Sequence, residues 1–121
     1  MDKIGEYLES RKVLDLFFIE FMKSNKTKET EFKLIDIKGE DYLVSYFFDS
    51  SNIIGYDLIK TNEILKTNNI NMVAFAVTEG DDIVCINTVD NTIWLWGIES
   101  CDGEFIKIED TFETFISRII K

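Results

Sequence analysis

The sequence predicts an α+β fold, in which a mainly antiparallel sheet, with a meander in the C-terminal half, packs against N-terminal and C-terminal helices. Three observations lead to this prediction. Apolar residues are nearly continuous over residues 13–22, without glycine or proline, which favours a largely buried helix. Residues 72–108 contain β-branched and aromatic runs separated by short turn sequences, as antiparallel strands do. Apolar side chains then recur at helical spacing from Phe112 to Ile120.

The first third of the chain is expected to form a helix, a loop and a hairpin. We predict the helix over about residues 3–23, with a break allowed near residues 10–12, and a polar loop over residues 24–31. Phe32–Ile37 and Tyr42–Phe48 have the composition of strands and are joined by the turn sequence Gly39-Glu40-Asp41. These two segments are therefore predicted to pair as a β-hairpin.

A short helix and the meander follow. Residues 49–52 have turn chemistry, residues 53–58 are ambiguous, and Thr61–Lys66 is predicted to be helical. Four strands come next, with turns between them, over residues 72–77, 83–88, 92–98 and 105–108.

The last helix has a start signal in its sequence. Asp110 is predicted to cap the free amides, and Glu113, three residues later, to reach back to the cap. This is a capping box with aspartate in the cap position.

Length and composition predict a single folded domain over residues 1–121. Neither a repeat nor a low-complexity linker divides the chain, and 45% hydrophobic residues with ten phenylalanines exceed what a disordered acidic chain contains. No apolar run approaches the roughly 20 residues that cross a bilayer, and the first residues are amphipathic rather than signal-like. We therefore expect a cytoplasmic protein that is neither secreted nor inserted into a membrane.

The charge of the chain limits its partners. Thirteen Lys and Arg against 23 Asp and Glu give a net charge of −10, which repels nucleic acids and anionic membranes, so neither is an expected partner. The charge is uneven, because residues 76–121 contain 10 acidic and 3 basic residues, a net charge of −7. Most of the negative field is therefore expected around the C-terminal meander.

The residue types argue against catalysis and against a cofactor. The chain has no histidine, so the commonest general base and the Ser-His and Cys-His pairs are absent, and it has no glycine-rich phosphate loop. Glu79, Asp81 and Asp82 lack the spacing of a calcium loop. Catalysis by two carboxylates alone, as in glycosidases, is not excluded by the sequence. Cys85 and Cys101 are not expected to form a disulfide in a reducing cytosol, and two thiols do not complete a zinc site.

The segment Thr92–Ile98 offers a candidate interface. Trp94 and Trp96 share one strand face, while Ile93 and Leu95 share the other. The simpler interpretation is a central strand covered on both sides; the alternative is that Trp96 is partly exposed and anchors a partner. Acidic residues in the neighbouring turns would then attract a basic partner. The candidate partner-binding residues are Glu79, Asp81, Asp82, Trp96, Glu99, Asp102 and Glu104.

The order of these segments resembles the SUKH superfamily. The resemblance covers residues 72–120 and consists of the strand Met72–Ala76, the Gly80-Asp81 turn before an Ile/Cys-containing strand, the Trp94 strand, and the closing helix with Phe112 and Phe115. The first half departs from the superfamily pattern, because Val13-Leu14-Asp15 stands where a Leu-Pro pair is common and the chain has no proline.

The resemblance implies an α+β domain without enzymatic activity. Bacterial members look like immunity proteins that neutralise a polymorphic or contact-dependent toxin, often a nuclease, and fungal members look like regulators of cell-wall synthesis. The leading hypothesis is therefore an immunity protein that binds a cognate, basic toxin domain inside the cell. The alternatives are a regulatory protein-interaction module and, third, a domain that binds a small ligand or a metal.

Overall fold

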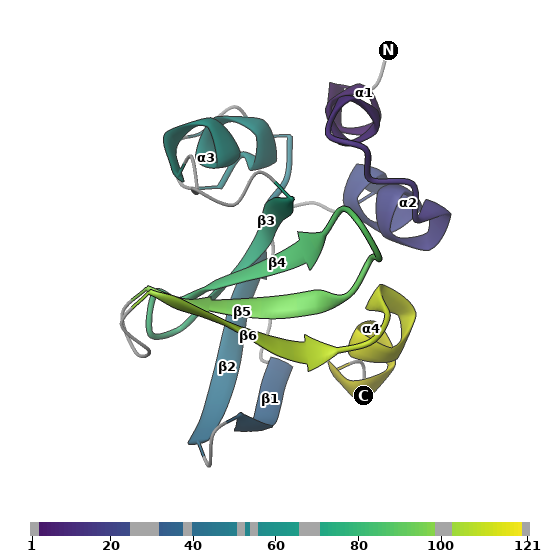
Figure 1. Ribbon diagram of the computed structural model, residues 1–121. Helices are drawn as coiled ribbons and strands as arrows, with labels where there is room; N and C mark the ends of the chain where they lie inside the picture. Colours follow the sequence, from purple (N-terminus) through teal and green to yellow (C-terminus); the bar gives the residue numbers. More distant parts are fainter. Residues whose placement is uncertain are drawn as a thin grey trace.

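The computed structural model is a strongly twisted antiparallel sheet with helices packed at one face and at its upper edge (Figure 1). It describes residues 3–24, 32–37, 40–50, 53, 56–65, 71–98 and 103–119. The sheet has six strands in the order β1-β2-β3-β4-β5-β6, so each strand pairs with its neighbour in sequence. The predicted α+β class is confirmed, and the meander runs through the whole sheet.

The helices and strands have the following bounds: α1 Lys3–Ser10, α2 Leu16–Ser24, β1 Phe32–Ile37, β2 Glu40–Phe47, α3 Leu58–Leu65, β3 Met72–Thr78, β4 Ile83–Asn87, β5 Ile93–Gly97, β6 Glu104–Glu109 and α4 Phe112–Ile119. The predicted hairpin is confirmed, although its second strand begins at Glu40. The predicted loop over residues 24–31 lies outside the described residues apart from Ser24, which ends α2.

A backbone motif divides the N-terminal helix at the predicted break. Lys12 has a φ of 69°, its N–H donates to the Glu9 carbonyl, and the Val13 N–H donates to the Leu8 carbonyl at 2.9 Å. This pair of bonds around a left-handed residue is the Schellman arrangement that ends helices. Val13 and Leu8 are both fully buried, so the motif also fixes the chain against the core.

A cluster of phenylalanines joins the helices to the sheet. Phe112 of α4 packs edge-on against Phe18 and Phe21 of α2, with ring centroids 4.8 and 5.2 Å apart, and against Phe75 of β3 at 5.4 Å. Phe75 also stacks with Phe47 of β2 at 6.1 Å. Because α4 contacts both edge strands, β1 and β6, it closes the sheet over this cluster. The side of the sheet that carries Phe47 is therefore the core side.

Helix α3 provides hydrogen bonds to β3 beyond the point where the pairing of β2 with β3 ends. The last described β2–β3 pair is Phe47 with Ala76. Beyond it, the buried Asn62 amide donates to the Ala74 carbonyl and accepts from the Ala74 N–H, both at 2.8 Å. One side chain thus replaces the missing strand partner, since a buried backbone group without a partner is costly.

Side chains of the residues immediately before α2, α3 and α4 supply caps that the sequence only partly predicted. Asp15 accepts from the Phe18 N–H at 3.1 Å, and Asp57 accepts from the Lys60 N–H at 3.0 Å. At α4 the predicted cap is wrong by one residue, because the hydroxyl of Thr111 accepts from the Thr114 N–H at 3.0 Å. Asp110 instead forms an ion pair with Lys107, and this leaves the capping role to the next residue.

Truncating the central phenylalanine tests the cluster. Phe112→Ala removes a fully buried ring that contacts α2 and β3, so we expect the free energy of unfolding to fall by about 3–5 kcal/mol. Phe17→Ala is the matched control, because Phe17 is 45% exposed, and its loss should stay near or below about 1 kcal/mol. Urea unfolding followed by circular dichroism measures both. Equal losses would show that Phe112 does not hold the core.

Removing the Asn62 amide tests the junction between α3 and β3. Asn62→Ala leaves the buried N–H and carbonyl of Ala74 without this partner, so we expect a loss of about 2–4 kcal/mol. The Ala74 amide should also exchange with solvent faster, which hydrogen exchange measured by NMR reports. The exposed neighbour Glu63→Ala should change neither quantity. Unchanged Ala74 protection in Asn62→Ala would refute this role.

Candidate functional site

A row of apolar side chains crosses five strands on the side of the sheet opposite the phenylalanine cluster. Strand register pairs Tyr46 with Val77, Val77 with Ile83, Ile83 with Trp96, and Trp96 with Phe105. Paired residues in a sheet point to the same face. We call these five residues, Tyr46, Val77, Ile83, Trp96 and Phe105, the aromatic row.

The aromatic row faces away from α2 and α4. Its first member, Tyr46, precedes Phe47, and successive strand residues point to opposite faces. Phe47 contacts Phe21 of α2 and Phe75 in the core, so Tyr46 points to the other face. In Figure 1, α2 and α4 lie on the right of the sheet, and α1 and α3 lie above it. Among the helices that the structure describes, none therefore crosses the C-terminal strands on the face with the aromatic row.

Three aromatic rings supply the exposed surface of the row. Tyr46, Trp96 and Phe105 are half-buried, whereas Val77 and Ile83 between them retain only 7% exposure each. Along β5 the burial alternates, with Leu95 fully buried on the core side and Trp96 half-buried. Trp96 is thus partly exposed in a strand that pairs with β4 and β6 on its two sides, and its role as an anchor stays a prediction.

Trp96 is held in one orientation by two contacts. Its ring stacks on Phe105 with centroids 5.2 Å apart and an interplanar angle of 10°. Its indole N–H donates to the Gly103 carbonyl at 3.2 Å. Gly103 has a φ of 81°, in the left-handed region that favours glycine, so the turn before β6 is built to present this carbonyl.

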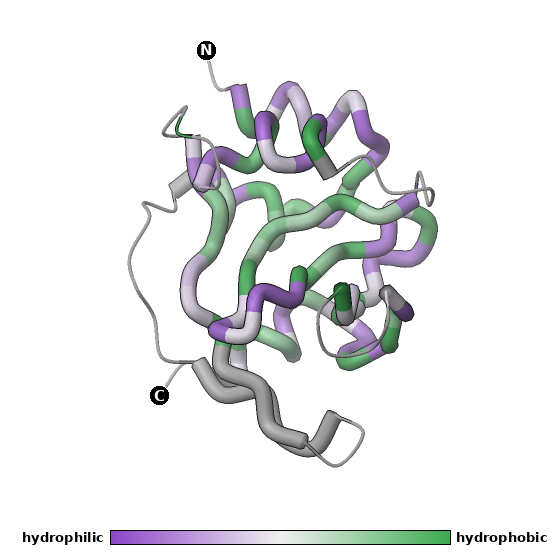
Figure 2. Tube along the Cα trace, turned by 90° about the vertical axis from the view of Figure 1, so that its left-hand side faces the viewer, coloured by the Kyte–Doolittle hydropathy of each residue, from purple (hydrophilic) through white to green (hydrophobic). Residues whose placement is uncertain are grey.

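Acidic side chains border the row at one end of the sheet. Ile83 at the start of β4 pairs with Trp96 near the end of β5, and Trp96 pairs with Phe105 near the start of β6. The end of β3, the start of β4, the end of β5 and the start of β6 therefore lie at the same end of the sheet. These strand ends lie at the left tip of the sheet in Figure 1, the side that faces the reader in Figure 2. Figure 2 shows hydrophobic colours along the strands and hydrophilic colours at many of the turns. Glu79, Asp81 and Glu104 are exposed here, and we call them the acidic rim.

The acidic rim acts electrostatically on the aromatic row. The pKa of Tyr46 is raised above its ordinary value, first by burial and then by the nearby Tyr56 and Asp81. Tyr46 also packs against Tyr56, with ring centroids 4.8 Å apart. Asp81 has a φ of 66°, a conformation that aspartate adopts more readily than most residues. The turn thus places the charge of Asp81 where it contributes to the raised pKa of Tyr46.

Three of the predicted partner-binding residues do not belong to this surface as described. Asp82 is fully buried, because its N–H donates to the Thr78 hydroxyl and its carbonyl accepts from the Thr78 N–H, which folds the turn inward. The expectation of an exposed Asp82 is corrected accordingly. Glu99 and Asp102 lie outside the described residues.

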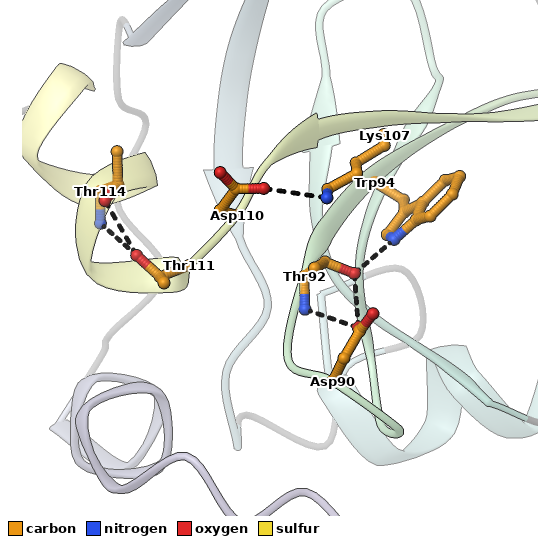
Figure 3. Close-up of polar contacts among 7 residues, drawn as sticks. All are labelled: Asp90, Thr92, Trp94, Lys107, Asp110, Thr111 and Thr114. Carbon is orange, nitrogen blue, oxygen red and sulfur yellow. Dashed lines mark hydrogen bonds and ion pairs between the residues drawn. The ribbon is translucent and has the colours of Figure 1, made fainter.

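A polar chain that the sequence did not single out lies at the other end of β5 (Figure 3). The indole N–H of Trp94 donates to the Thr92 hydroxyl at 2.7 Å, and this hydroxyl donates to Asp90 at 2.6 Å. Lys107, paired in register with Trp94, forms an ion pair with Asp110 at 2.9 Å. The sequence signal for these hydrogen bonds is the spacing Asp-x-Thr-x-Trp, in which Asp90 and Thr92 precede β5 and Trp94 lies within it.

These contacts shift two ionisation equilibria. Hydrogen bonds from the Thr92 side chain and backbone lower the pKa of Asp90, and Lys107 adds to this effect. The hydrogen bond and charge of Asp110 raise the pKa of Lys107. Both groups therefore stay charged over a wider pH range.

Several kinds of site can be checked on the described residues. Among them, no group of three or more His, Cys, Asp or Glu side chains is arranged to hold a metal ion. No described helix is long and apolar enough to span a bilayer. Cys85 is a free, fully buried thiol whose pKa is raised by burial, and Cys101 lies outside the described residues.

The fold and this surface define an α+β domain built on one antiparallel meander, with helices behind it and an aromatic row with an acidic rim in front. The model of the SMI1 / KNR4 family (SUKH-1) matches residues 10–118, so the chain belongs to this family. The match confirms the resemblance seen in residues 72–120 and extends it over most of the N-terminal third. Comparisons with curated proteins and with solved structures found no match.

Breaking the bond between Thr92 and Asp90 should change an acid titration. Because the folded pKa of Asp90 is lowered, its contribution to stability is present above its ordinary pKa and is lost as pH falls through the lowered value. Thr92→Val removes the hydroxyl but keeps the shape and the backbone N–H, so the pKa of Asp90 should rise part of the way back. NMR titration of the carboxyl carbon measures it. An identical titration in both proteins would contradict the assignment.

Proposed function

We propose that this protein is an immunity protein, which binds a cognate toxin domain inside the cell and blocks its action without catalysis. The SMI1 / KNR4 (SUKH-1) family includes toxin immunity proteins, which supports the proposal. The observation that carries it is the acidic rim at the open end of the sheet, in a chain with a net charge of −10. Many toxins of this kind act on nucleic acids and have basic surfaces, which such a rim complements.

The charges favour a role in association. Residues 76–121 have a net charge of −7, and all three residues of the acidic rim lie in this segment. A charged patch of one sign raises the rate at which an oppositely charged partner arrives, by about 10-fold to 1000-fold at low salt. An inhibitor that must reach a toxin before the toxin reaches its target benefits directly from this rate.

Co-expression with the toxin domain encoded by the adjacent gene tests the proposal. Cells that produce this toxin domain should survive only when the protein is produced with it, and the two purified proteins should form a stable complex. An unrelated acidic protein of similar size serves as the control. Cell death despite production of the folded protein, or the absence of a complex, would overturn the proposal.

Charge reversal on the acidic rim should slow association. Glu79→Lys combined with Glu104→Lys changes the net charge by +4 at the rim, and we expect association with the toxin domain at low salt to be about 10-fold slower or more. Glu9→Lys combined with Glu63→Lys makes the same change on exposed positions of α1 and α3. Stopped-flow kinetics at several salt concentrations measures both pairs of substitutions.

The salt series separates the rim from the overall charge. The association rate of the wild-type protein should fall as salt rises, because ions screen exposed charges beyond about 10 Å at 0.1 M salt. The rim variant should show a shallower dependence than the control variant. Equal slopes would assign the effect to net charge alone and not to Glu79 and Glu104.

A further inference from the structure

The aromatic row places three half-buried aromatic rings on one face of the sheet. These three half-buried rings come from three strands, β2, β5 and β6, and the register aligns them across the sheet. Isolated exposed apolar residues are ordinary, but a contiguous apolar surface with polar residues around it is a mark of protein interfaces. The aromatic row combines half-buried rings with exposed carboxylates at the neighbouring strand ends, and Val77 and Ile83 are nearly buried between Tyr46 and Trp96.

The row is also preorganised for contact. Trp96 is stacked on Phe105 and hydrogen-bonded to Gly103, and Tyr46 is packed against Tyr56. Behind the row, the core residues Val84 and Leu95 are fully buried and fix the strands. Side chains that are already ordered lose little conformational entropy on binding, so more of their contact energy becomes affinity.

The charge around the row indicates what covers it. A second copy of this chain placed face to face would bring two acidic rims, and two chains of charge −10, close together. Like charges brought together at an interface repel each other and oppose binding. A partner with Lys and Arg around an apolar patch meets the same surface without this penalty.

We infer that the aromatic row is the central contact surface for the partner, and that the partner covers it with an apolar patch bordered by basic side chains. This inference rests on the proposed function, because the partner is the toxin domain of that proposal. Trp96 is the anchor, since tryptophan at the centre of an interface contributes disproportionately to affinity. Tyr46 and Phe105 complete the contact on either side.

Substitution of the anchor gives the first test. Trp96→Ala should weaken the Kd for the toxin domain at least about 30-fold, mostly through faster dissociation. Phe17→Ala is the matched control, since it removes an exposed aromatic ring from α2, whose rings pack on the core side of the sheet. Thermal unfolding of each variant establishes that it is folded before binding is measured.

Fluorine NMR gives a second readout that needs no destabilising substitution. The chain has two tryptophans, so the protein labelled with 5-fluorotryptophan has two resonances, which Trp94→Phe and Trp96→Phe assign. Unlabelled toxin domain should shift the Trp96 resonance on saturation. Because only this protein carries fluorine, aromatic residues of the partner do not interfere.

The outcomes separate the two proposals. If the wild-type protein neither binds the toxin domain nor protects cells, the proposed function fails and this inference fails with it. If the wild-type protein binds, but Trp96→Ala binds within about 3-fold of it and the Trp96 resonance does not move, the aromatic row is not the contact surface and the proposed function stands. If light scattering shows a dimer of the wild-type protein that Trp96→Ala makes monomeric, the row is an interface between copies of this chain, and the inference is overturned.

Discussion

Packing of Phe112 against α2 and Phe75 is the contact on which the rest of the architecture depends. It joins the N-terminal helices to the last helix through one ring, although these elements are far apart in the sequence. Because α4 also contacts both edge strands, this packing curves the sheet around one face. The opposite face is consequently left without α2 and α4, and its aromatic side chains are only half-buried. The candidate binding surface is thus a direct consequence of how the core is closed.

Much of this fold could be predicted because its signals are local. The apolar stripe from Phe112, the short turns of the meander and the hairpin of β1 and β2 depend on residues close together in sequence. The replacement of β2 by the Asn62 side chain of α3 as hydrogen-bond partner of β3 could not be predicted. Asn62 pairs with the backbone of Ala74, which is twelve residues away in the sequence. The cap of α4 was misplaced because Asp110 and Thr111 are both good caps, and the nearby Lys107 decides which one is used.

The candidate site could be predicted in part. The sequence identified Trp96 and the acidic turns, since alternation along one strand and clustering of charge are both visible in it. The aromatic row as a whole could not be foreseen, because bulges in β2–β3, β3–β4 and β5–β6 set which residues align across the sheet. The burial of Asp82 could not be predicted either, because an aspartate in a turn sequence is normally exposed. Here the Asp82 N–H donates to the Thr78 hydroxyl and the residue is fully buried.

The acidic rim and the aromatic row act at different distances, so they have different roles in the proposed binding. Exposed carboxylates act beyond contact and are screened by salt, so they govern how often a basic partner arrives. The aromatic row acts only on contact, through removal of apolar surface from water, and governs how long the partner stays. The two parts are adjoining, because Val77 and Ile83 flank the turn that contains Glu79 and Asp81, and Glu104 directly precedes Phe105. In the proposed complex, a partner guided by the rim would arrive beside the rings of the aromatic row and would have to match both their shape and the charge of the rim.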